Sequence, residues 1–493
     1  MPNSYSYNQV FTKTHKYPDR QAVYAEGRYH IYAELNLHIK YIYQQLCLNK
    51  IEAKRIAIIC SNDFWTVATI CAVLKYGAAY VPILNNSPLE RKKWIINDVQ
   101  PGLILAQSTL PELEKIPTLK IDFDDVMVNE DLELIPQISH SEAFILYTSG
   151  STGMPKGVPV PKDGLDHCFE WMFDYFNFDE NDRFLQPFRW TFDISVFSFL
   201  VPLSIGACCY LLPKSSGIQS LTILDCLKKH EITVVCLVPS VISLTRKYLP
   251  ELKVPSLRYS LFGGEALYNN LAQLWKNAFP NAQIVNMYGP SETTIYMSYY
   301  EWDFETSSKE SLNNIVPLGK ILPNHEFILL DINKIIEEKL TTGELCISGI
   351  QLIANYVNNI QQERFVELFW KDEKRIFYKT GDLVQINDNG NLLFIGRNDE
   401  QVQIQGHRVE VKEIEFHLSN ITKVENVIIV KERNEAEKYL VAFIKKCDLV
   451  DKEIKNALIK HVPHYMIPRK IIFIDKLPRN LNGKVDKKAL KLL

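Results

Sequence analysis

The sequence predicts an α/β protein with a large N-terminal domain and a small α+β C-terminal domain. At 493 residues the chain is too long for a single hydrophobic core. From about residue 55 to residue 212, short apolar runs alternate with helical stretches, which is typical of parallel strands covered by helices. The chain changes character after residue 396, and the ~95 residues beyond it are enough for a separate domain. We therefore expect domains at residues 1–396 and 397–493.

The individual elements follow from hydrophobic periodicity. Turn sequences at Thr342-Gly343 and Asp388-Asn389-Gly390 favour hairpins within a second sheet-rich region, Ile315–Ile395. Strands are expected at Ile56–Cys60, Ala79–Ile83, Gly102–Ala106, Ala143–Tyr147, Thr233–Val238, Leu257–Phe262, Gln283–Met287, Val424–Val430 and Tyr439–Ile444. Helices are expected at Phe64–Lys75, Pro88–Asp98, Lys412–Ser419 and Asp451–His461.

The stretch Ile194–Leu212 has no formal charge over 19 residues, which is long enough for a membrane span. Pro202 and Gly206 interrupt it, and its end is rich in β-strand formers. We therefore predict a short buried helix followed by a buried strand, and no membrane span.

The bulk composition is that of an ordinary globular protein. Lys+Arg number 55 against 58 Asp+Glu, so the net charge of −3 gives no reason to expect nucleic acid as a partner. Ten cysteines lie scattered without a CxxC pair, which favours reduced thiols and a cytoplasmic location. The N-terminus lacks the apolar core of a secretory signal.

A run rich in glycine and hydroxyl side chains, residues 148–157, follows a predicted strand. Backbone N–H groups in such loops surround phosphates, and Lys156 is expected to add a mobile positive charge. The run is not a Walker A loop, because Gly157 and not Ser or Thr follows Lys156. It predicts a site for a polyphosphate nucleotide, and a solvated linker is the alternative.

Four further motifs offer groups that suit a nucleotide. Tyr288 offers an aromatic ring on which a base could stack, and the carboxylate of Glu292 is close to it in sequence. Asp382 lies at the end of a predicted strand and offers a carboxylate for ribose hydroxyls. Arg397 stands at the domain boundary and Lys484 on a turn near the C-terminus. Considered one at a time, these residues have simpler explanations: Tyr288 could be a core residue, Asp382 a helix cap and Lys484 a solvated surface lysine.

In this order the motifs resemble those of the adenylate-forming superfamily, which contains acyl-CoA synthetases, firefly luciferase and the adenylation domains of nonribosomal peptide synthetases. The resemblance covers nearly the whole chain and extends to residues 74–82, 343–345 and 399–410. It is greatest for the amino-acid adenylating branch, which includes the free-standing D-alanine–carrier protein ligase. It implies layered α/β sheets with a distorted β-barrel-like region, and a mobile C-terminal lid that turns about Asp399.

The resemblance also implies ATP and Mg²⁺ as cofactors and two half-reactions in one active site. Lys484 and Thr148 would be catalytic, and Glu292 would be catalytic and would ligate Mg²⁺. After the lid turns, Gly406 would line the opening for a phosphopantetheine thiol. The implied ATP-binding residues are Thr148, Ser149, Gly150, Ser151, Thr152, Gly153, Lys156, Gly264, Glu265, Ala266, Asn286, Met287, Tyr288, Gly289, Ser291, Asp382, Arg397 and Lys484.

Asp193 discriminates between classes of acid substrate. A buried carboxylate is costly unless a cation meets it, and the resemblance pairs this residue with a substrate ammonium group. A cap on the following helix is the alternative role. The implied lining of the pocket is Asp193, Ile194, Phe197, Cys236, Leu261, Gly263, Met287, Ile295 and Tyr296.

The lining favours a very small amino acid. Phe197, Met287 and Tyr296 are bulky, and the pocket offers no second charge for a polar side chain. Glycine ranks first, D- or L-alanine second and proline third.

The acceptor is expected to be a separate carrier protein with a phosphopantetheine arm, because no carrier domain follows Lys484 in this sequence. Such carriers are typically acidic. The basic residues Arg469, Lys470, Lys487 and Lys488 either contact the carrier or form an ordinary solvated face.

Other functions stay open at this level. An acyl- or aryl-CoA ligase would make Asp193 structural and use CoA as the thiol. A non-catalytic regulator that binds nucleotide or acyl-adenylate would have no need for Lys484, Glu292 and Asp382 together. A luciferase-like oxygenase is disfavoured by Asp193 alone.

Overall fold

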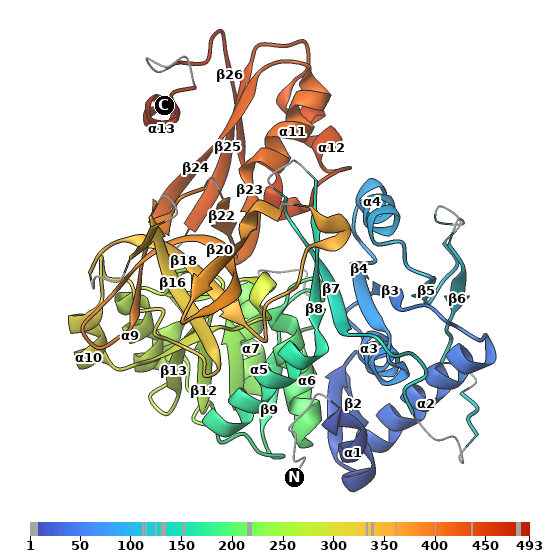
Figure 1. Ribbon diagram of the computed structural model, residues 1–493. Helices are drawn as coiled ribbons and strands as arrows, with labels where there is room; N and C mark the ends of the chain where they lie inside the picture. The colour runs from blue at the N-terminus through green and yellow to red at the C-terminus, as the bar shows by residue number, and fades with distance from the viewer. Residues whose placement is uncertain are drawn as a thin grey trace.

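The computed structural model shows a small C-terminal domain resting on a larger N-terminal one (Figure 1). The residues that the structure describes are 8–110, 113, 116–123, 126–129, 135–150, 154–213, 219–331, 334–336, 340–360, 362–399, 401–434, 437–479 and 485–493.

One sheet of the large domain has six strands in the order β6-β5-β3-β4-β7-β8. These are β3 (Arg55–Cys60), β4 (Ala79–Leu84), β5 (Leu103–Ala106), β6 (Thr118–Lys120), β7 (Glu142–Thr148) and β8 (Lys156–Pro161). All neighbours pair in parallel except β8, which returns antiparallel to β7. Helix α3 (Phe64–Tyr76) connects β3 to β4, and α4 (Leu89–Val99) connects β4 to β5, as the alternating pattern predicts.

A second sheet has nine strands in the order β15-β14-β13-β12-β11-β9-β10-β1-β2. They are β1 (Gln21–Ala25), β2 (Arg28–Ile31), β9 (Arg183–Gln186), β10 (Cys208–Leu211), β11 (Val234–Leu237), β12 (Tyr259–Phe262), β13 (Gln283–Tyr288), β14 (Ser298–Trp302) and β15 (Lys320–Ile321). Its centre, from β1 to β13, is parallel. The other helices of the large domain are α1 (Gln9–Lys16), α2 (Tyr32–Leu48), α5 (Lys162–Tyr175), α6 (Ile194–Ile205), α7 (Gln219–Lys229), α8 (Ser240–Thr245), α9 (Asn269–Ala278) and α10 (Phe304–Glu310).

The third sheet occupies the region where a barrel-like arrangement is expected. It contains β16 (His325–Asp331), β17 (Lys334–Ile336), β18 (Gly343–Gly349), β19 (Phe365–Trp370), β20 (Glu373–Ile386) and β21 (Leu392–Arg397). The turn at residues 388–390 joins β20 to its antiparallel partner β21, as predicted. The prediction of a hairpin at Thr342-Gly343 is wrong, because β17 and β18 both pair with β16, on its two sides.

The small domain has its own sheet and core. A two-stranded ribbon, β22 (Gln401–Ile404) and β23 (His407–Glu410), precedes a sheet of β24 (Asn426–Asn434), β25 (Glu437–Lys445) and β26 (Lys470–Ile474). Helices α11 (Val411–Thr422) and α12 (Asp451–Leu458) bury Ile414, Leu418 and Ile454 against one face of that sheet. Helix α13 (Lys487–Leu492) buries Leu490 against the other face.

The prediction for residues 194–212 is confirmed, since α6 is buried along its length and β10 is a buried strand. Within the part of the chain that the structure describes, no helix combines the length and apolar character of a membrane span. The cysteines are free thiols, and most are buried, including Cys208, Cys209 and Cys236.

Candidate active site

A cavity of about 350 Å³ lies between the two domains. It opens at the carboxyl ends of β12 and β13, which is where parallel α/β sheets usually bind ligands. The predicted residues on its wall are Asp193, Ile194, Gly264, Glu265, Ala266, Asn286, Met287, Tyr288, Gly289, Ser291, Ile295, Tyr296, Asp382, Arg397 and Gly406. The structure therefore brings together most of the predicted nucleotide, substrate and thiol-opening residues.

Some predicted residues lie elsewhere. Phe197, Cys236, Leu261 and Gly263 stand behind the wall and not on it. Thr148, Ser149, Gly150, Lys156 and Glu292 lie beside the cavity on the β7–β8 side and in the turn η3 (Ser291–Thr293). Ser151, Thr152, Gly153 and Lys484 lie outside the described residues.

The start of the predicted phosphate loop is tightly packed against the small domain. Ser149 Oγ donates to the carbonyl of Arg408 at 2.8 Å and accepts the Glu410 N–H at 3.0 Å. A Cβ on Gly150 would lie 1.9 Å from the Met154 carbonyl, so only glycine fits this turn. The hydroxyl of Thr148 is buried without a partner among the described residues.

Lys156 is 1% exposed, so it is a buried charge and not the mobile cation that its glycine-rich surroundings suggest. Its Nζ lies 3.0 Å from Glu292 Oε1 and donates to the Tyr356 hydroxyl at 2.8 Å. Burial lowers the pKa of Lys156 to about 8, against the attraction of Glu292. Burial alone would raise the pKa of Glu292, but the cations Arg408 and Lys156 hold it well below its ordinary value. Glu292 is therefore an ionised carboxylate in the protein interior.

Arg408 is the important residue that the sequence analysis does not single out. It lines the cavity from β23 of the small domain, and its Nη1 donates to both oxygens of Glu292, at 3.0 and 2.8 Å. Its Nε and Nη2 are buried without a partner among the described residues. The signal available in the sequence was a cation two residues after Gly406, within a motif that already carried the resemblance.

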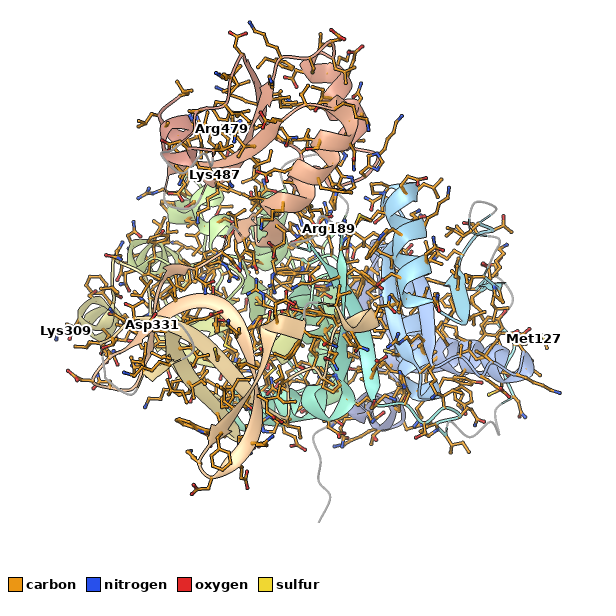
Figure 2. All side chains as sticks on the ribbon, turned by 45° about the horizontal axis from the view of Figure 1, so that its top comes forward. Met127, Arg189, Lys309, Asp331, Arg479 and Lys487 are labelled. Atoms are coloured by element: carbon orange, nitrogen blue, oxygen red, sulfur yellow. The ribbon has the colours of Figure 1, made fainter. Side chains whose placement is uncertain are left out.

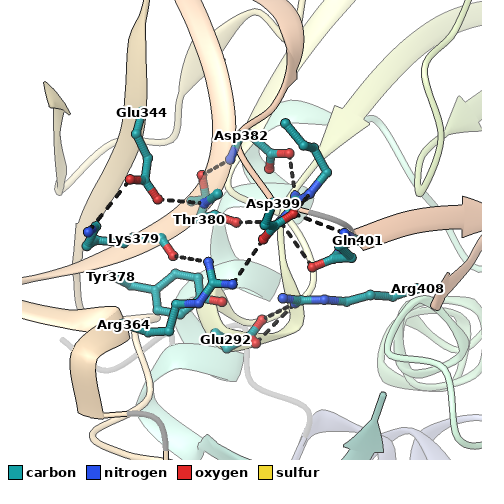
Figure 3. Close-up of polar contacts among 12 residues, drawn as sticks. Glu292, Glu344, Arg364, Tyr378, Lys379, Thr380, Asp382, Asp399, Gln401 and Arg408 are labelled. Atoms are coloured by element: carbon teal, nitrogen blue, oxygen red, sulfur yellow. Dashed lines mark hydrogen bonds and ion pairs between the residues drawn. The ribbon is translucent and has the colours of Figure 1, made fainter. Parts of the chain in front are cut away.

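A chain of ion pairs links the predicted ribose-binding residue to the predicted hinge (Figure 3). Asp382 accepts from the Tyr288 hydroxyl at 2.6 Å and from Arg397 Nη1 at 2.5 Å. Arg397 also donates to both oxygens of Asp399, at 2.7 and 2.8 Å, and Arg364 donates to Asp399 at 2.9 Å. Although burial would raise it, the bonds to Arg397 and Arg364 lower the pKa of Asp399 to about 2.

Asp193 caps a helix, which is one of the two roles predicted for it, and it also lies where it could meet a ligand. Its Oδ1 accepts the Ile194 N–H at 2.8 Å and so caps α6, while the residue also lies on the cavity wall. Burial raises the pKa of this carboxyl from 3.8 to about 6.

The back of the cavity is closed by a layer of side chains around Tyr296. The Tyr296 hydroxyl and the Cys236 thiol are 2.9 Å apart, and the Phe197 ring lies edge-on to Tyr296 with centroids 6.0 Å apart. A Cβ on Gly263 would stand 3.1 Å from the Met287 carbonyl and 3.5 Å from the Tyr296 ring. Tyr296 is the member of this layer that lies on the cavity wall.

The tip of the β22–β23 ribbon forms the opposite wall. Gly406, at φ +78°, donates its N–H to Glu265 Oε1 at 2.6 Å, and an added Cβ would lie 2.2 Å from Val238 Cγ1. The next residue, His407, stacks on Tyr465 at 3.8 Å. The ribbon is thus fixed in the cavity by contacts that only glycine permits at its tip.

Comparison with known proteins identifies the family. The model of the AMP-binding enzyme family matches residues 10–357, and that of the AMP-binding enzyme C-terminal domain matches residues 413–484. This chain belongs to the AMP-binding enzyme family. Much longer proteins contain a similar stretch. The AMP-binding enzyme is 31% identical over 489 aligned positions to tyrocidine synthase 3 of Brevibacillus parabrevis, covering 96% of this chain and 7% of that protein. It is 30% identical over 501 positions to the dimodular nonribosomal peptide synthase of Bacillus subtilis, covering 96% of this chain and 21% of that protein.

Two solved structures illustrate the shared fold. The adenylation domain AlmE of Vibrio cholerae, in complex with glycyl-adenosine-5'-phosphate, superposes with a TM-score of 0.85 at 24% identity, covering 100% of this chain and 98% of AlmE. The four-domain nonribosomal peptide synthetase AB3403, bound to AMP and glycine, gives 0.70 at 27% identity, covering 99% of this chain and 36% of that one. This AMP-binding enzyme spans less than half the length of curated relatives such as the two synthases named above.

Proposed function

We propose that this AMP-binding enzyme activates a small amino acid, glycine first, and passes it to a carrier protein. In the first half-reaction an oxygen of the amino-acid carboxylate attacks the α-phosphorus of ATP. The bond from that phosphorus to the bridging oxygen breaks, pyrophosphate leaves, and aminoacyl-AMP forms. In the second half-reaction a phosphopantetheine thiolate attacks the acyl carbon, and AMP leaves as the thioester forms.

The observation that carries the proposal is the carboxylate of Asp193 on the cavity wall. The group is 5% exposed, and no cation pairs with it among the described residues. Burial makes its charge costly, and a substrate ammonium group would offset that cost. Fatty and aryl acids lack such a group, so this carboxylate favours amino acids over the substrates of acyl- and aryl-CoA ligases.

The closed back of the cavity supports glycine as the first choice. Tyr296, held by Cys236 and bordered by Phe197, occupies the volume that a longer side chain needs. AB3403, which has AMP and glycine bound, shares the fold at 27% identity. D- or L-alanine and then proline follow, in that order of size.

For the first half-reaction, the donors around β7 and β8 suit the phosphates. Thr148 pairs with Lys156 in the register of these two strands, and Lys156 Nζ lies 3.0 Å from Glu292 Oε1. Proteins usually hold Mg²⁺ with one or two carboxylates together with substrate phosphates, and Glu292 is the carboxylate proposed for that role. The metal would neutralise charge on the departing pyrophosphate. Lys484 is proposed to bridge the substrate carboxylate and the α-phosphate.

The arrangement of the small domain supports a role in the second half-reaction. Gly406 and Arg408 line the cavity, whereas Arg479 and Val485, on either side of residues 480–484, pair with each other on the small domain. Figure 2 shows Arg479 and Lys487 on the small domain, well apart from Arg189 near the domain junction. We infer that the domain turns about Asp399, which would bring Lys484 in for adenylation.

The acceptor is proposed to be a separate phosphopantetheinylated carrier protein. Arg469 and Lys470 are exposed, a few residues beyond Tyr465, which stacks on His407 next to Gly406. If an acidic carrier protein bound to these two residues, its phosphopantetheine arm would be close to Gly406 at the tip of the β22–β23 ribbon.

The test is ATP–pyrophosphate exchange with glycine, L- and D-alanine, proline, serine and β-alanine, with octanoate and benzoate as plain acids. We expect exchange with glycine above all and none with the plain acids. Exchange only with octanoate or benzoate would overturn the proposal and make this enzyme a CoA ligase. Adding a phosphopantetheinylated carrier protein should then yield the glycyl thioester.

A further inference from the structure

Two consecutive residues of the site have a backbone conformation that their side chains disfavour. Thr294 has φ +58° and Ile295 has φ +67°, both in the left-handed region. Both residues are β-branched, and a β-branched residue in that region is an outlier. Such conformations persist only where the surrounding structure fixes them, and they are concentrated at functional sites. Ile295 and its neighbour Tyr296 line the cavity, so the strained segment, residues 294–296, sets the position of part of the wall.

Four hydrogen bonds to the strained segment and the residue before it come from Gln351, which lies in the loop after β18. Gln351 Nε2 donates to the backbone carbonyls of Thr293, Thr294 and Tyr296, at 3.1, 3.1 and 2.8 Å. The backbone carbonyl of Gln351 accepts from the Thr294 hydroxyl at 2.7 Å. Gln351 is 0% exposed, so no water replaces these bonds. Removal of the amide would leave three carbonyls without this donor, which is costly in a protein interior.

The orientation of the Gln351 amide is fixed by His167 of α5. His167 Nδ1 lies 3.0 Å from Gln351 Oε1, and His167 Nε2 lies 3.4 Å from Asn324 Nδ2. An amide nitrogen can only donate, so His167 Nε2 accepts, and Nδ1 carries the proton of the neutral ring. His167 therefore donates to Gln351 Oε1, which leaves the amide nitrogen directed at the strained segment.

The same loop also holds the preceding turn, but by other groups. The Ile353 N–H donates to the Glu292 carbonyl at 3.0 Å, and the Tyr356 hydroxyl donates to Glu292 Oε1 at 2.6 Å. These two bonds do not involve the Gln351 side chain. Replacement of Gln351 should therefore release the strained segment and leave Glu292 in place.

We propose that Gln351 is a positioning residue that limits the size of the substrate by holding Tyr296 on the cavity wall. The inference rests on the proposed function, in which Tyr296 occupies the volume that a longer amino-acid side chain needs. The described wall of the cavity does not include Gln351, so this residue acts on the substrate only through the strained segment. Without the amide, the Tyr296 ring should move more freely and admit a methyl group.

Pyrophosphate exchange with glycine and alanine tests the proposal in the full chain. Gln351→Met keeps an unbranched side chain of similar length and removes the amide. The ratio of kcat/KM for glycine to kcat/KM for alanine should fall by about tenfold, the low end of the usual worth of one methylene. KM for ATP should stay at the wild-type value, because the bonds to Glu292 remain. An unchanged ratio in Gln351→Met would overturn the proposal.

A double variant separates positioning of Tyr296 from other effects of the substitution. In a Tyr296→Ala background, Gln351→Met should not lower the ratio further, because the ring through which Gln351 acts is already absent. A further fall of the same size in that background would show that Gln351 acts by another route.

Gln186→Met is the matched control for general loss of stability. Gln186 is 1% exposed, and its Nε2 donates to the Phe188 carbonyl at 3.0 Å, so its replacement also removes a buried amide. This variant should lose thermal stability and keep the wild-type ratio of glycine to alanine. A fall in the ratio as large as that in Gln351→Met would assign the effect to destabilisation and refute the positioning role.

Hydrogen–deuterium exchange gives a readout that does not depend on the substrate. The Tyr296 N–H donates to the Thr294 carbonyl at 2.8 Å, and the Met297 N–H donates to the Tyr288 carbonyl at 2.7 Å. In Gln351→Met these two amides should exchange about tenfold faster, as expected for the loss of a buried hydrogen bond, and in Gln186→Met they should not.

The two measurements distinguish failure of this inference from failure of the proposed function. If the wild type exchanges pyrophosphate with neither glycine nor alanine, the proposed function fails, whatever the amides of the strained segment do. If glycine is activated and the Tyr296 and Met297 amides exchange equally fast in Gln351→Met and the wild type, only the role of Gln351 fails.

Discussion

The hydroxyl of Ser291 donates a 2.5 Å hydrogen bond to Oδ2 of Asp193. The other oxygen, Oδ1, accepts the Ile194 N–H, so both oxygens have neutral donors. These donors lower the pKa of Asp193 but do not cancel its burial, which raises it to about 6. The protein thus orients the carboxylate through two neutral donors, and no ion pair with it is formed among the described residues. This is the arrangement that a binding group for a cationic substrate requires.

Replacing Asp193 with Asn should remove glycine-dependent pyrophosphate exchange without unfolding the enzyme. Loss of one partner of a buried ion pair costs roughly 3–5 kcal/mol, or at least about 100-fold in exchange. Between pH 3.8 and about 6 the folded state holds more protons than the unfolded one, so ionisation of Asp193 lowers the stability as the pH rises. Thermal unfolding at pH 7.5 should therefore show no loss of Tm for the neutral Asn. Exchange that survives in this variant would contradict the ammonium pairing.

The pH dependence of glycine binding should report Asp193. Only the ionised carboxylate attracts ammonium, so kcat/KM for glycine should fall by about tenfold per unit as the pH drops below about 6. Ser291→Ala removes a bond that lowers this pKa, and the break should move to higher pH. Ser195→Ala removes a nearby buried hydroxyl that has no partner among the described residues, and it should leave the break in place. A break that stays fixed in Ser291→Ala would show that another group titrates.

Much of the architecture could be predicted because the spacing of apolar residues along a single segment indicates whether it forms a helix or a strand. The strand before the phosphate loop and the helices α3 and α4 begin and end within one residue of the predicted bounds, and the predicted helix and strand both lie within residues 194–212. Helix α3 begins at the cap Asp63 and is buried almost throughout, whereas α4 shows a one-sided apolar pattern, and both patterns can be recognised without knowledge of distant partners.

The contacts that complete the site could not be predicted in the same way. Arg408 and Glu292 are 116 residues apart and meet only because the small domain lies in one particular orientation. Likewise, nothing in the glycine-rich sequence around Lys156 reveals that Glu292 and Tyr356 bury it. The misread turn at Thr342-Gly343 has the same cause, since pairing order in a sheet is a long-range property.

Opening the back of the cavity should broaden the substrate range. Tyr296→Ala removes a ring that limits the depth beyond Asp193, and the preference for glycine over alanine should fall by about tenfold or more, the usual worth of one methylene. The measurement is pyrophosphate exchange with glycine and alanine side by side. Tyr296→Phe removes only the hydroxyl that contacts Cys236 and keeps the ring, so it should retain the preference. Equal selectivity in both variants would mean that this layer does not set the substrate size.

Lys484→Ala should separate the two half-reactions. A positioned charge that acts on the transition state is worth ~3–4 kcal/mol, so adenylation should fall by about 10²–10³-fold. Transfer from supplied glycyl-AMP to a carrier protein should persist, because Gly406 and Arg408 line the cavity in the arrangement seen here, while Arg479 and Val485 pair on the small domain. Lys446→Ala removes another lysine of the small domain, one that lies 2.8 Å from Asp475, and both half-reactions should proceed normally. Equal loss of both half-reactions in Lys484→Ala would contradict a turning domain that presents Lys484 to one step and the ribbon to the other.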